Sequence, residues 1–491
     1  MAPTLTKKGS CCASCSAGVP VCAAFRMPLV PEKDAPLTEF GELIPLSEVP
    51  RDPLQGGVAP WAPRPLADLR RDASPLLMGG GVFGRGMYNP EQMLYSDTAV
   101  HVLRLALQYG FTALDSSPYY YPSELVLGRA LRIVASEHPR SSYFLITKCG
   151  RYGPDRVHFD YSPERVERSL RESCQRLGTP YLDAGLLHDA EFVADQPPVD
   201  REPDGPWLPA QAVGVECARA QPRTTEEARA LLGIGDGDAA TVRGPGDEKV
   251  LAAVRTLFKL KDEGLLRNVG ISGYPLPELL RISRLVATQP PYRPLDVILS
   301  YSNHTLHSDL LPAYQRLLDE EPAPARDHRP WRAPMLLNAS PFSMGLLSGR
   351  SPPGWHPADE ALRAAADEAT AKLHAAVDAG APRGITRENV MGLTALFAGV
   401  RGSESFTDGV PLLRTLVGMS SVEEVHMAVA AYRALAAGAG SPESRARLSP
   451  GEFERARAWY DALMRYEHIV RDVMQKANVN AWCWPSPPPG A

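Results

Sequence analysis

The sequence predicts an α/β protein built as a (β/α)8 TIM barrel, with an N-terminal extension and long insertions. From residue 74 onward, short apolar runs alternate with segments of helical periodicity, and this alternation occurs eight times. The apolar runs are continuous, which is typical of parallel strands that are buried on both faces. Eight strand–helix units in roughly 370 residues favour a closed barrel over an open doubly wound sheet.

The eight expected strands are short, and several of them end in a polar residue. They lie at residues 76–83, 111–115, 143–148, 181–188, 268–272, 296–301, 334–339 and 415–418.

The expected helices begin and end at recognisable caps. Ser96 is expected to cap a helix over 97–109 that ends at Gly110. Ser162 and Pro163 are expected to open a helix that ends at Gly178. A long amphipathic helix over 452–476 is expected to pack across one end of the barrel. The remaining helices are expected at 124–135, 248–263, 277–287, 309–318, 359–379 and 422–437.

Proline marks the segments outside this pattern, since 48 of the 491 residues are proline. Residues 1–73 show little periodicity and are expected to be a poorly ordered extension, followed by the barrel over 74–480. Insertions are expected at 194–246 and 380–410, and residues 481–491 form a proline-rich tail.

The composition excludes several classes of function. The net charge of −5 comes without a basic stripe, so a nucleic-acid partner is not expected. The longest apolar runs are shorter than the roughly 20 residues that cross a bilayer, so no membrane association is expected. Four of the eight cysteines lie within the first 22 residues, but their single CxxC has no second pair, so no metal is expected. The cysteines elsewhere are sparse, which favours a cytoplasmic location.

A glycine-rich string at residues 79–84 matches the dinucleotide pattern GxGxxG. That motif holds a pyrophosphate only where a helix opens within it. Here a loop with Gly86 and Pro90 follows, so a Rossmann fold is disfavoured.

Four polar residues gather where three expected strands end. Asp115, Lys148 and His188 each close a strand, and Tyr120 lies in the loop after Asp115. Catalytic residues of such barrels sit at the carboxyl ends of the strands. Free tyrosine has a pKa of about 10, and a neighbouring cation lowers it. We therefore expect Lys148 to tune Tyr120 as a general acid/base, Asp115 to hold the ammonium, and His188 to orient the substrate oxygen.

The segments Asp115-Ser-Ser-Pro-Tyr-Tyr120, Thr147-Lys148 and Leu186-Leu-His188-Asp189 resemble the catalytic tetrad segments of the aldo-keto reductase family. The resemblance covers roughly residues 74–438, with the insertions as interruptions. It implies that Tyr120, rather than its neighbours Tyr119 and Tyr121, is the acid/base, because the family places tyrosine five residues after the aspartate.

The same resemblance implies a nicotinamide cofactor. Ser272 would contact the nicotinamide amide; the family often has asparagine where this chain has Gly273, and glutamine where it has Leu299. The loop after the seventh strand would cover the pyrophosphate. Gly418 and Glu424 stand where NADP-preferring members carry basic residues, so NAD is expected over NADP. The residues implied as cofactor contacts are Gly81, Val82, Phe83, Ser272, Gly273, Leu299, Ser340, Pro341, Phe342, Met344, Gly418, Met419, Ser420 and Glu424.

Within the family, strings at 83–89, 187–192, 258–264, 271–276 and 299–303 resemble the D-arabinose 1-dehydrogenase and L-galactose dehydrogenase group. This resemblance implies NAD-linked oxidation of the anomeric C1 hydroxyl of an aldose to a lactone, in a pathway to ascorbate or its five-carbon analogue erythroascorbate. The candidate sugar contacts are Tyr119, Asp189, Asn303 and His304, each with a structural role as the alternative.

Two other functions stay open at this point. One is a broad-specificity aldehyde or ketone reductase that uses NADPH. The other is a barrel that binds nicotinamide as a regulatory or scaffolding subunit, against which the intact tetrad argues.

Overall fold

We describe a computed structural model of the chain at residues 30–31, 33–34, 41–50, 66–195, 241–319, 332–402, 406–407, 410–411, 413–439, 447–480, 482 and 484. Most of the expected insertion at 194–246, and residues 485–491 of the tail, lie outside this part of the chain.

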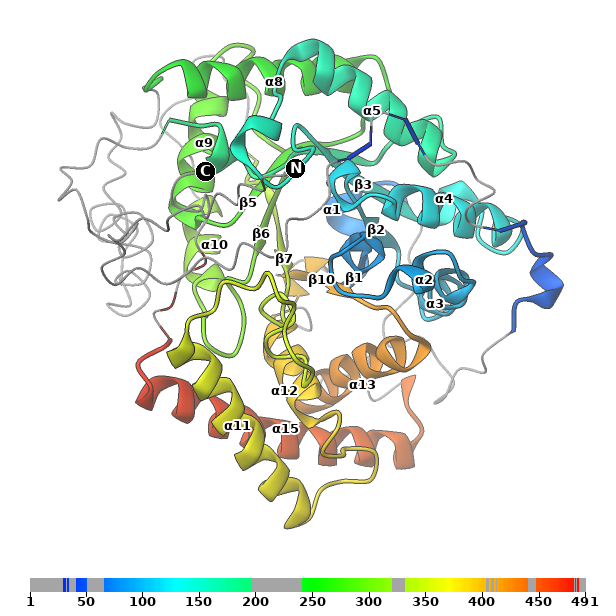
Figure 1. Ribbon diagram of the computed structural model, residues 1–491, viewed down its shortest axis with the longest axis vertical. Helices are drawn as coiled ribbons and strands as arrows, with labels where there is room; N and C mark the ends of the chain where they lie inside the picture. The colour runs from blue at the N-terminus through cyan, green and yellow to red at the C-terminus, as the bar shows by residue number, and fades with distance from the viewer. Residues whose placement is uncertain are drawn as a thin grey trace, which may run out of the picture.

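Eight parallel strands close into a barrel in the order β1-β10-β7-β6-β5-β4-β3-β2, which confirms the predicted fold. In Figure 1 the strands lie at the centre and the helices surround them. The barrel strands are β1 (Leu76–Gly79), β2 (Ala113–Asp115), β3 (Phe144–Cys149), β4 (Ala184–Leu187), β5 (Val269–Gly273), β6 (Val297–Tyr301), β7 (Met335–Ala339) and β10 (Arg414–Gly418).

Most of the described helices lie close to their expected positions, and three further helices, at Leu69–Asp72, Glu91–Leu94 and Val390–Gly399, were not predicted. In chain order, the helices are α1 (Leu69–Asp72), α2 (Glu91–Leu94), α3 (Thr98–Gln108), α4 (Ser123–Ile133), α5 (Pro163–Leu177), α8 (Pro245–Asp262), α9 (Leu276–Thr288), α10 (Leu311–Asp319), α11 (Glu360–Asp378), α12 (Val390–Gly399), α13 (Val422–Gly438) and α15 (Pro450–Lys476). A two-stranded hairpin, β8 (Phe406–Thr407) with β9 (Val410–Pro411), precedes β10.

The caps explain where two of these helices begin and end. α5 starts after Ser162 with Pro163 in its first turn and ends at Gly178, whose φ of 68° is left-handed, as expected from the sequence. The N-cap of α3 is Asp97 and not Ser96. Ser96 instead donates its hydroxyl to the Met93 carbonyl at 2.7 Å, in the turn before the helix.

The strands bury both faces, and alternate residues supply two separate cores. Leu77, Phe144 and Leu337 belong to the cluster inside the barrel, while Leu76 and Leu145 belong to the cluster between the strands and the outer helices. This is the two-residue period of a barrel strand. It fixes which side chains at the strand ends face the barrel axis.

The barrel begins earlier than the expected boundary at residue 74. Leu69 of α1 and the adjacent Ala73 join the inner cluster, and Arg414 of β10 donates to the Ala73 carbonyl at 3.1 Å. Arg129 of α4 donates to the Glu42 carbonyl at 2.8 Å, so part of the extension is held against the outer helices.

The expected interruption at 380–410 contains a helix, α12. Every residue of α12 is buried, and Asn338 of β7 donates to the Gly399 carbonyl at its end, at 2.8 Å. A helix that is apolar all round has no amphipathic period, so the sequence pattern did not reveal it.

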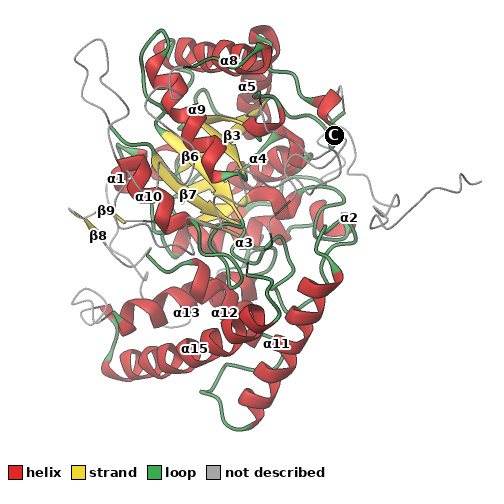
Figure 2. Ribbon diagram, turned by 90° about the vertical axis from the view of Figure 1, so that its left-hand side faces the viewer, coloured by secondary structure: helices red, strands yellow, loops and turns green. Residues whose placement is uncertain are grey.

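The last helix, α15, was expected to pack across one end of the barrel. It begins at a capping box of Ser449 and Glu452 and instead lies alongside α11, α12 and α13. Figure 2 shows these helices grouped on one side of the strands.

Candidate active site

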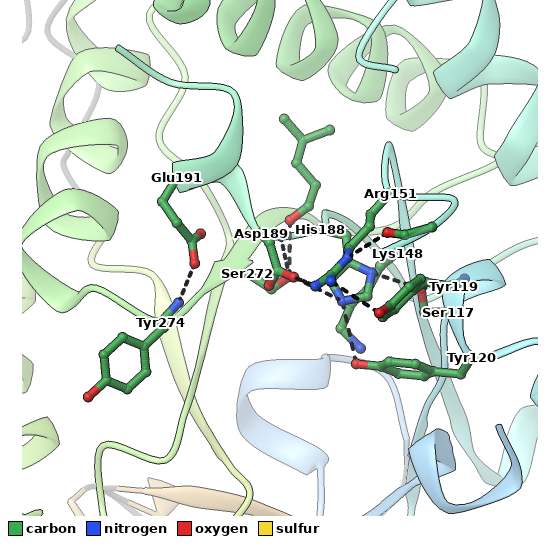
Figure 3. A network of polar contacts seen from close by, with 12 residues as sticks. Ser117, Tyr119, Tyr120, Lys148, Arg151, His188, Asp189, Glu191, Ser272 and Tyr274 are labelled. Atoms are coloured by element: carbon green, nitrogen blue, oxygen red, sulfur yellow. Dashed lines mark hydrogen bonds and ion pairs between the residues drawn. The ribbon is translucent and has the colours of Figure 1, made fainter. Parts of the chain in front are cut away.

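The four tetrad candidates meet at the carboxyl ends of three neighbouring strands, and Figure 3 shows Tyr120, Lys148 and His188 close together. Asp115 ends β2, Lys148 lies in β3, and His188 directly follows β4. Tyr120 ends a 3-10 turn over Pro118–Tyr120. Ser117 caps that turn by accepting the Tyr119 N–H at 3.1 Å, which directs the tyrosines back over the barrel.

Asp115 and Lys148 form a buried ion pair. The Lys148 Nζ lies 2.6 Å from Asp115 Oδ2 and 3.1 Å from the Ser116 carbonyl, and both side chains are at most 5% exposed. The ammonium also lies 4.9 Å from the centre of the Tyr120 ring. Two of the three ammonium N–H groups therefore donate hydrogen bonds, which keep the positive charge beside the tyrosine.

His188 approaches the other side of Tyr120. The Tyr120 hydroxyl and His188 Nε2 are 3.5 Å apart, and the rings meet edge-to-face with centroids 5.4 Å apart. On its far side, His188 Nδ1 lies 2.9 Å from the Ser117 hydroxyl. The imidazole is thus fixed from behind, and Nε2 faces the space above Tyr120.

Burial governs the protonation of these groups. It raises the pKa of Tyr120 well above its usual value, and Asp115 and Asp189 add to the increase. Burial, with Lys148 and Arg151, lowers the pKa of His188 well below its usual value, so the imidazole is neutral. The expectation that Lys148 lowers the pKa of Tyr120 does not hold in this structure, because burial and the Asp115 and Asp189 carboxylates raise that pKa.

A second polar cluster beside the tetrad includes Arg151, which the sequence analysis missed. The Arg151 guanidinium pairs with Asp189 and donates to the Tyr119 hydroxyl at 3.1 Å, with the Tyr119 ring centre 4.0 Å away. Asp189 takes a left-handed φ of 54°, a conformation that a non-glycine residue keeps only when its surroundings hold it. Arg151 lies two residues beyond the end of β3, and this position at a strand end is the signal that could have identified it from the sequence.

A cavity of about 720 Å³ opens above the tetrad, a volume in the range of small-molecule and cofactor sites. The candidate residues that line it are Asp115, Tyr119, Tyr120, Lys148, His188, Asp189, Gly81, Val82, Ser272, Leu299, Ser340, Pro341, Phe342, Met344, Gly418, Ser420 and Glu424.

Five candidates lie outside the cavity wall. Phe83 and Met419 are fully buried in the outer core. Gly273 faces Glu191, and a Cβ there would come within 2.1 Å of a carboxylate oxygen, which explains why no asparagine fits. Asn303 donates to the Tyr274 carbonyl at 2.7 Å, which joins the loops after β5 and β6, and His304 lies 2.5 Å from Asp309 in its own loop.

The far end of the cavity is built by two segments. Ser340, Ser343, Met344 and Gly345 all have positive φ, which folds the loop after β7 into a tight cover. The first turn of α13, capped by Ser421, forms the other side. A helix N-terminus is a favourable place for an anionic group, so the chemistry of this end fits a nucleotide.

Glu424 has two sets of partners at this end. It accepts the Ser420 N–H at 2.6 Å, and its other oxygen lies 3.0 Å from Arg350, which also lines the cavity. The sequence analysis missed Arg350, ten residues beyond Ser340. The acidic character expected here is therefore balanced by a cation that is 69% exposed.

Other kinds of site find no support in the part of the chain that the structure describes. There, no group of three or more His, Cys, Asp or Glu residues could hold a metal ion. No described helix is both long enough and apolar enough to span a bilayer.

A half-buried tyrosine, a paired lysine and a neutral histidine at the rim of a closed barrel form an arrangement suited to proton transfer. The sequence profile of the Aldo/keto reductase family matches residues 75–318. D-arabinose 1-dehydrogenase of Saccharomyces cerevisiae is 32% identical over 299 residues, which cover 60% of this chain and 69% of that protein. L-galactose dehydrogenase of Arabidopsis thaliana is 31% identical over 369 residues, 74% of this chain and 83% of that protein.

The chain therefore belongs to the aldo/keto reductase family, which confirms the resemblance. Members of this family are oxidoreductases that use nicotinamide cofactors. Among solved structures, a glycerol dehydrogenase from Gluconobacter oxydans is 20% identical with a TM-score of 0.41, over 73% of this chain and 86% of that one.

Proposed function

We propose that the protein oxidises the anomeric C1 hydroxyl of an aldose to the aldonolactone, with NAD as the hydride acceptor. The observation that carries this proposal is that Tyr120, Lys148 and His188 lie together at the base of the cavity. The Arg151–Asp189 ion pair lines the same cavity. The names of the two relatives, a D-arabinose 1-dehydrogenase and an L-galactose dehydrogenase, support an aldose as substrate.

The tetrad residues divide the proton chemistry among them. In the oxidation, the C1–H bond breaks with its electron pair leaving as hydride, the hydroxyl proton passes to the Tyr120 oxygen, and C1 becomes a carbonyl carbon. The neutral His188 Nε2 faces the same space and would position the sugar oxygen by a hydrogen bond. Lys148 stabilises the deprotonated tyrosine, and Asp115 holds the lysine in place.

The polar wall suits a polyol. A sugar hydroxyl that enters a cavity without a partner loses its hydration at a cost of about 1–3 kcal/mol. Asp189 offers carboxylate oxygens, Arg151 offers N–H groups, and Tyr119 offers a hydroxyl. Together they would hold the hydroxyls on one edge of the sugar.

A substrate and cofactor panel on the purified protein tests the function. We expect D-arabinose or L-galactose with NAD to give lactone, measured as NADH absorbance and by lactone trapping with hydroxylamine. The competing function, a broad aldehyde reductase, predicts faster turnover of simple aldehydes with NADPH. If none of the aldoses tested gives a lactone, the proposal is contradicted.

The pair of Arg350 and Glu424 supports NAD as the preferred cofactor and yields a second prediction. Glu424 would accept from a ribose hydroxyl and repel a 2′-phosphate, while it keeps Arg350 occupied. Glu424→Gln should free Arg350 for the phosphate and lower the KM for NADP by about tenfold, equivalent to about 1.4 kcal/mol. It should raise the KM for NAD.

The double variant Glu424→Gln/Arg350→Met is the matched control, since it has neither charge and should lose the gain with NADP. The measurement is the KM for each cofactor at a fixed aldose concentration. A wild-type protein that already prefers NADP, or an equal gain in the double variant, would contradict this assignment.

A further inference from the structure

Two tryptophans from the C-terminal segment return to the mouth of the cavity. After α15 ends at Lys476, Asn478 adopts a left-handed φ of 56° and the chain reverses. The backbone N–H of Trp482 donates to the Val479 carbonyl at 3.0 Å, and the Val479 side chain is buried. This turn carries Trp482 and Trp484 back toward the carboxyl ends of the strands.

Trp484 forms part of the cavity wall and packs against three other aromatic rings. It is 9% exposed, lines the cavity, and meets Tyr301 edge-to-face with centroids 6.0 Å apart. Tyr301, the last residue of β6, lines the same cavity. The other two rings are His356, with centroids 5.0 Å apart, and Trp482, with centroids 5.9 Å apart.

His356 gives Trp484 a fixed support. Its Nδ1 accepts the Ala358 N–H at 3.1 Å, so the hydrogen is on Nε2, which donates to the Ser343 carbonyl at 2.9 Å. Burial lowers the pKa of His356 to about 4, so the ring stays neutral at ordinary pH. The same bond joins this support to the loop after β7.

The cavity therefore has two kinds of wall. One wall consists of Arg151, Asp189 and Tyr119, which supply charged and polar atoms. The other wall consists of the aromatic rings of Trp484 and Tyr301. A sugar ring has matching surfaces: hydroxyls on its edge and C–H groups on its face.

We propose that Trp484, supported by Tyr301, is the platform on which the apolar face of the aldose ring packs. The positive edges of the sugar C–H bonds complement the negative face of an indole ring. The polar wall then holds the hydroxyls and sets the orientation of C1 toward Tyr120. This inference rests on the proposed aldose oxidation and adds a residue that selects rings over small acyclic substrates.

The test compares steady-state kinetics of the wild type with Trp484→Ala, Trp484→Phe and Trp482→Ala. Trp482 is the comparison from the same segment, because it packs on Trp484, His307 and His356 but does not line the cavity. Trp484→Ala should raise the KM for the aldose by about tenfold or more, while Trp484→Phe stays within about threefold of the wild type. Trp482→Ala should raise the KM for the aldose by no more than about twofold. The KM for glyceraldehyde reduction should change by no more than about twofold in every variant.

The outcomes separate this inference from the function beneath it. If the wild type oxidises aldoses and Trp484→Ala leaves the aldose KM unchanged, the platform is overturned and the function stands. An equal KM increase in Trp482→Ala, or for glyceraldehyde, assigns Trp484 to general packing and also overturns it. A wild type that oxidises no aldose overturns both. Thermal melting of each variant identifies any loss of fold, and Trp484→Phe then decides the question.

Discussion

Tyr120→Phe is expected to lower kcat for aldose oxidation by about a thousandfold, within the 10²–10⁴-fold range of a general acid–base group. The variant keeps the ring that lies against Lys148 and His188 and removes the oxygen that exchanges the proton. The KM for the sugar should change little, because the polar wall of Arg151 and Asp189 is untouched. Initial rates of NADH formation measure the effect.

Tyr119→Phe is the matched control, because it is a neighbouring buried tyrosine whose hydroxyl accepts from Arg151. It should mainly raise the KM for the sugar. Full turnover in Tyr120→Phe would contradict the catalytic assignment, whereas an equal loss of kcat in both variants would point to a structural effect.

The pH dependence of the wild type follows from the raised pKa of Tyr120. Oxidation needs the deprotonated oxygen and reduction needs the protonated one. The oxidation rate should therefore still rise as the pH increases through about 9, while the rate of the reverse reduction falls. His188 has a lowered pKa, so no limb near pH 6.5 should arise from it.

The sequence predicted the parts of this molecule that repeat or carry a local signal. Strand positions follow from apolar runs, and the ends of α5 follow from Pro163 and Gly178. The tetrad could be identified because each member lies at or just beyond a strand end, and in a barrel those ends meet.

What the sequence did not predict depends on contacts between distant segments. The pairing of Arg350 with Glu424 joins a loop to the first turn of α13, 74 positions further along the chain, and Trp484 reaches β6 from the C-terminal segment. The pKa of Tyr120 was expected to fall because Lys148 is close, but the depth of burial decides it. Burial is a property of the whole packing and cannot be read from spacing.

Lys148→Met is expected to lower the free energy of unfolding by about 3–5 kcal/mol at pH 8, because it leaves Asp115 buried without its cation. Oδ1 of Asp115 already has no partner among the described residues, so no other group takes over. Urea denaturation followed by circular dichroism measures the loss. The surface pair of Lys259 and Glu167 offers a control, and Lys259→Met should change the free energy of unfolding far less than Lys148→Met does.

The loss in Lys148→Met should also depend on pH in a defined direction. Burial already raises the pKa of Asp115, and removal of the ammonium raises it further. The folded variant then keeps a proton that the unfolded chain releases above about pH 4, so its stability falls as the pH rises through the folded-state pKa. The variant should therefore be closer to the wild type at pH 5 than at pH 8. The double variant Asp115→Asn/Lys148→Met removes both charges and should recover most of the loss without this pH dependence. A single variant with wild-type stability at pH 8 would show that Asp115 does not depend on Lys148 for its charge.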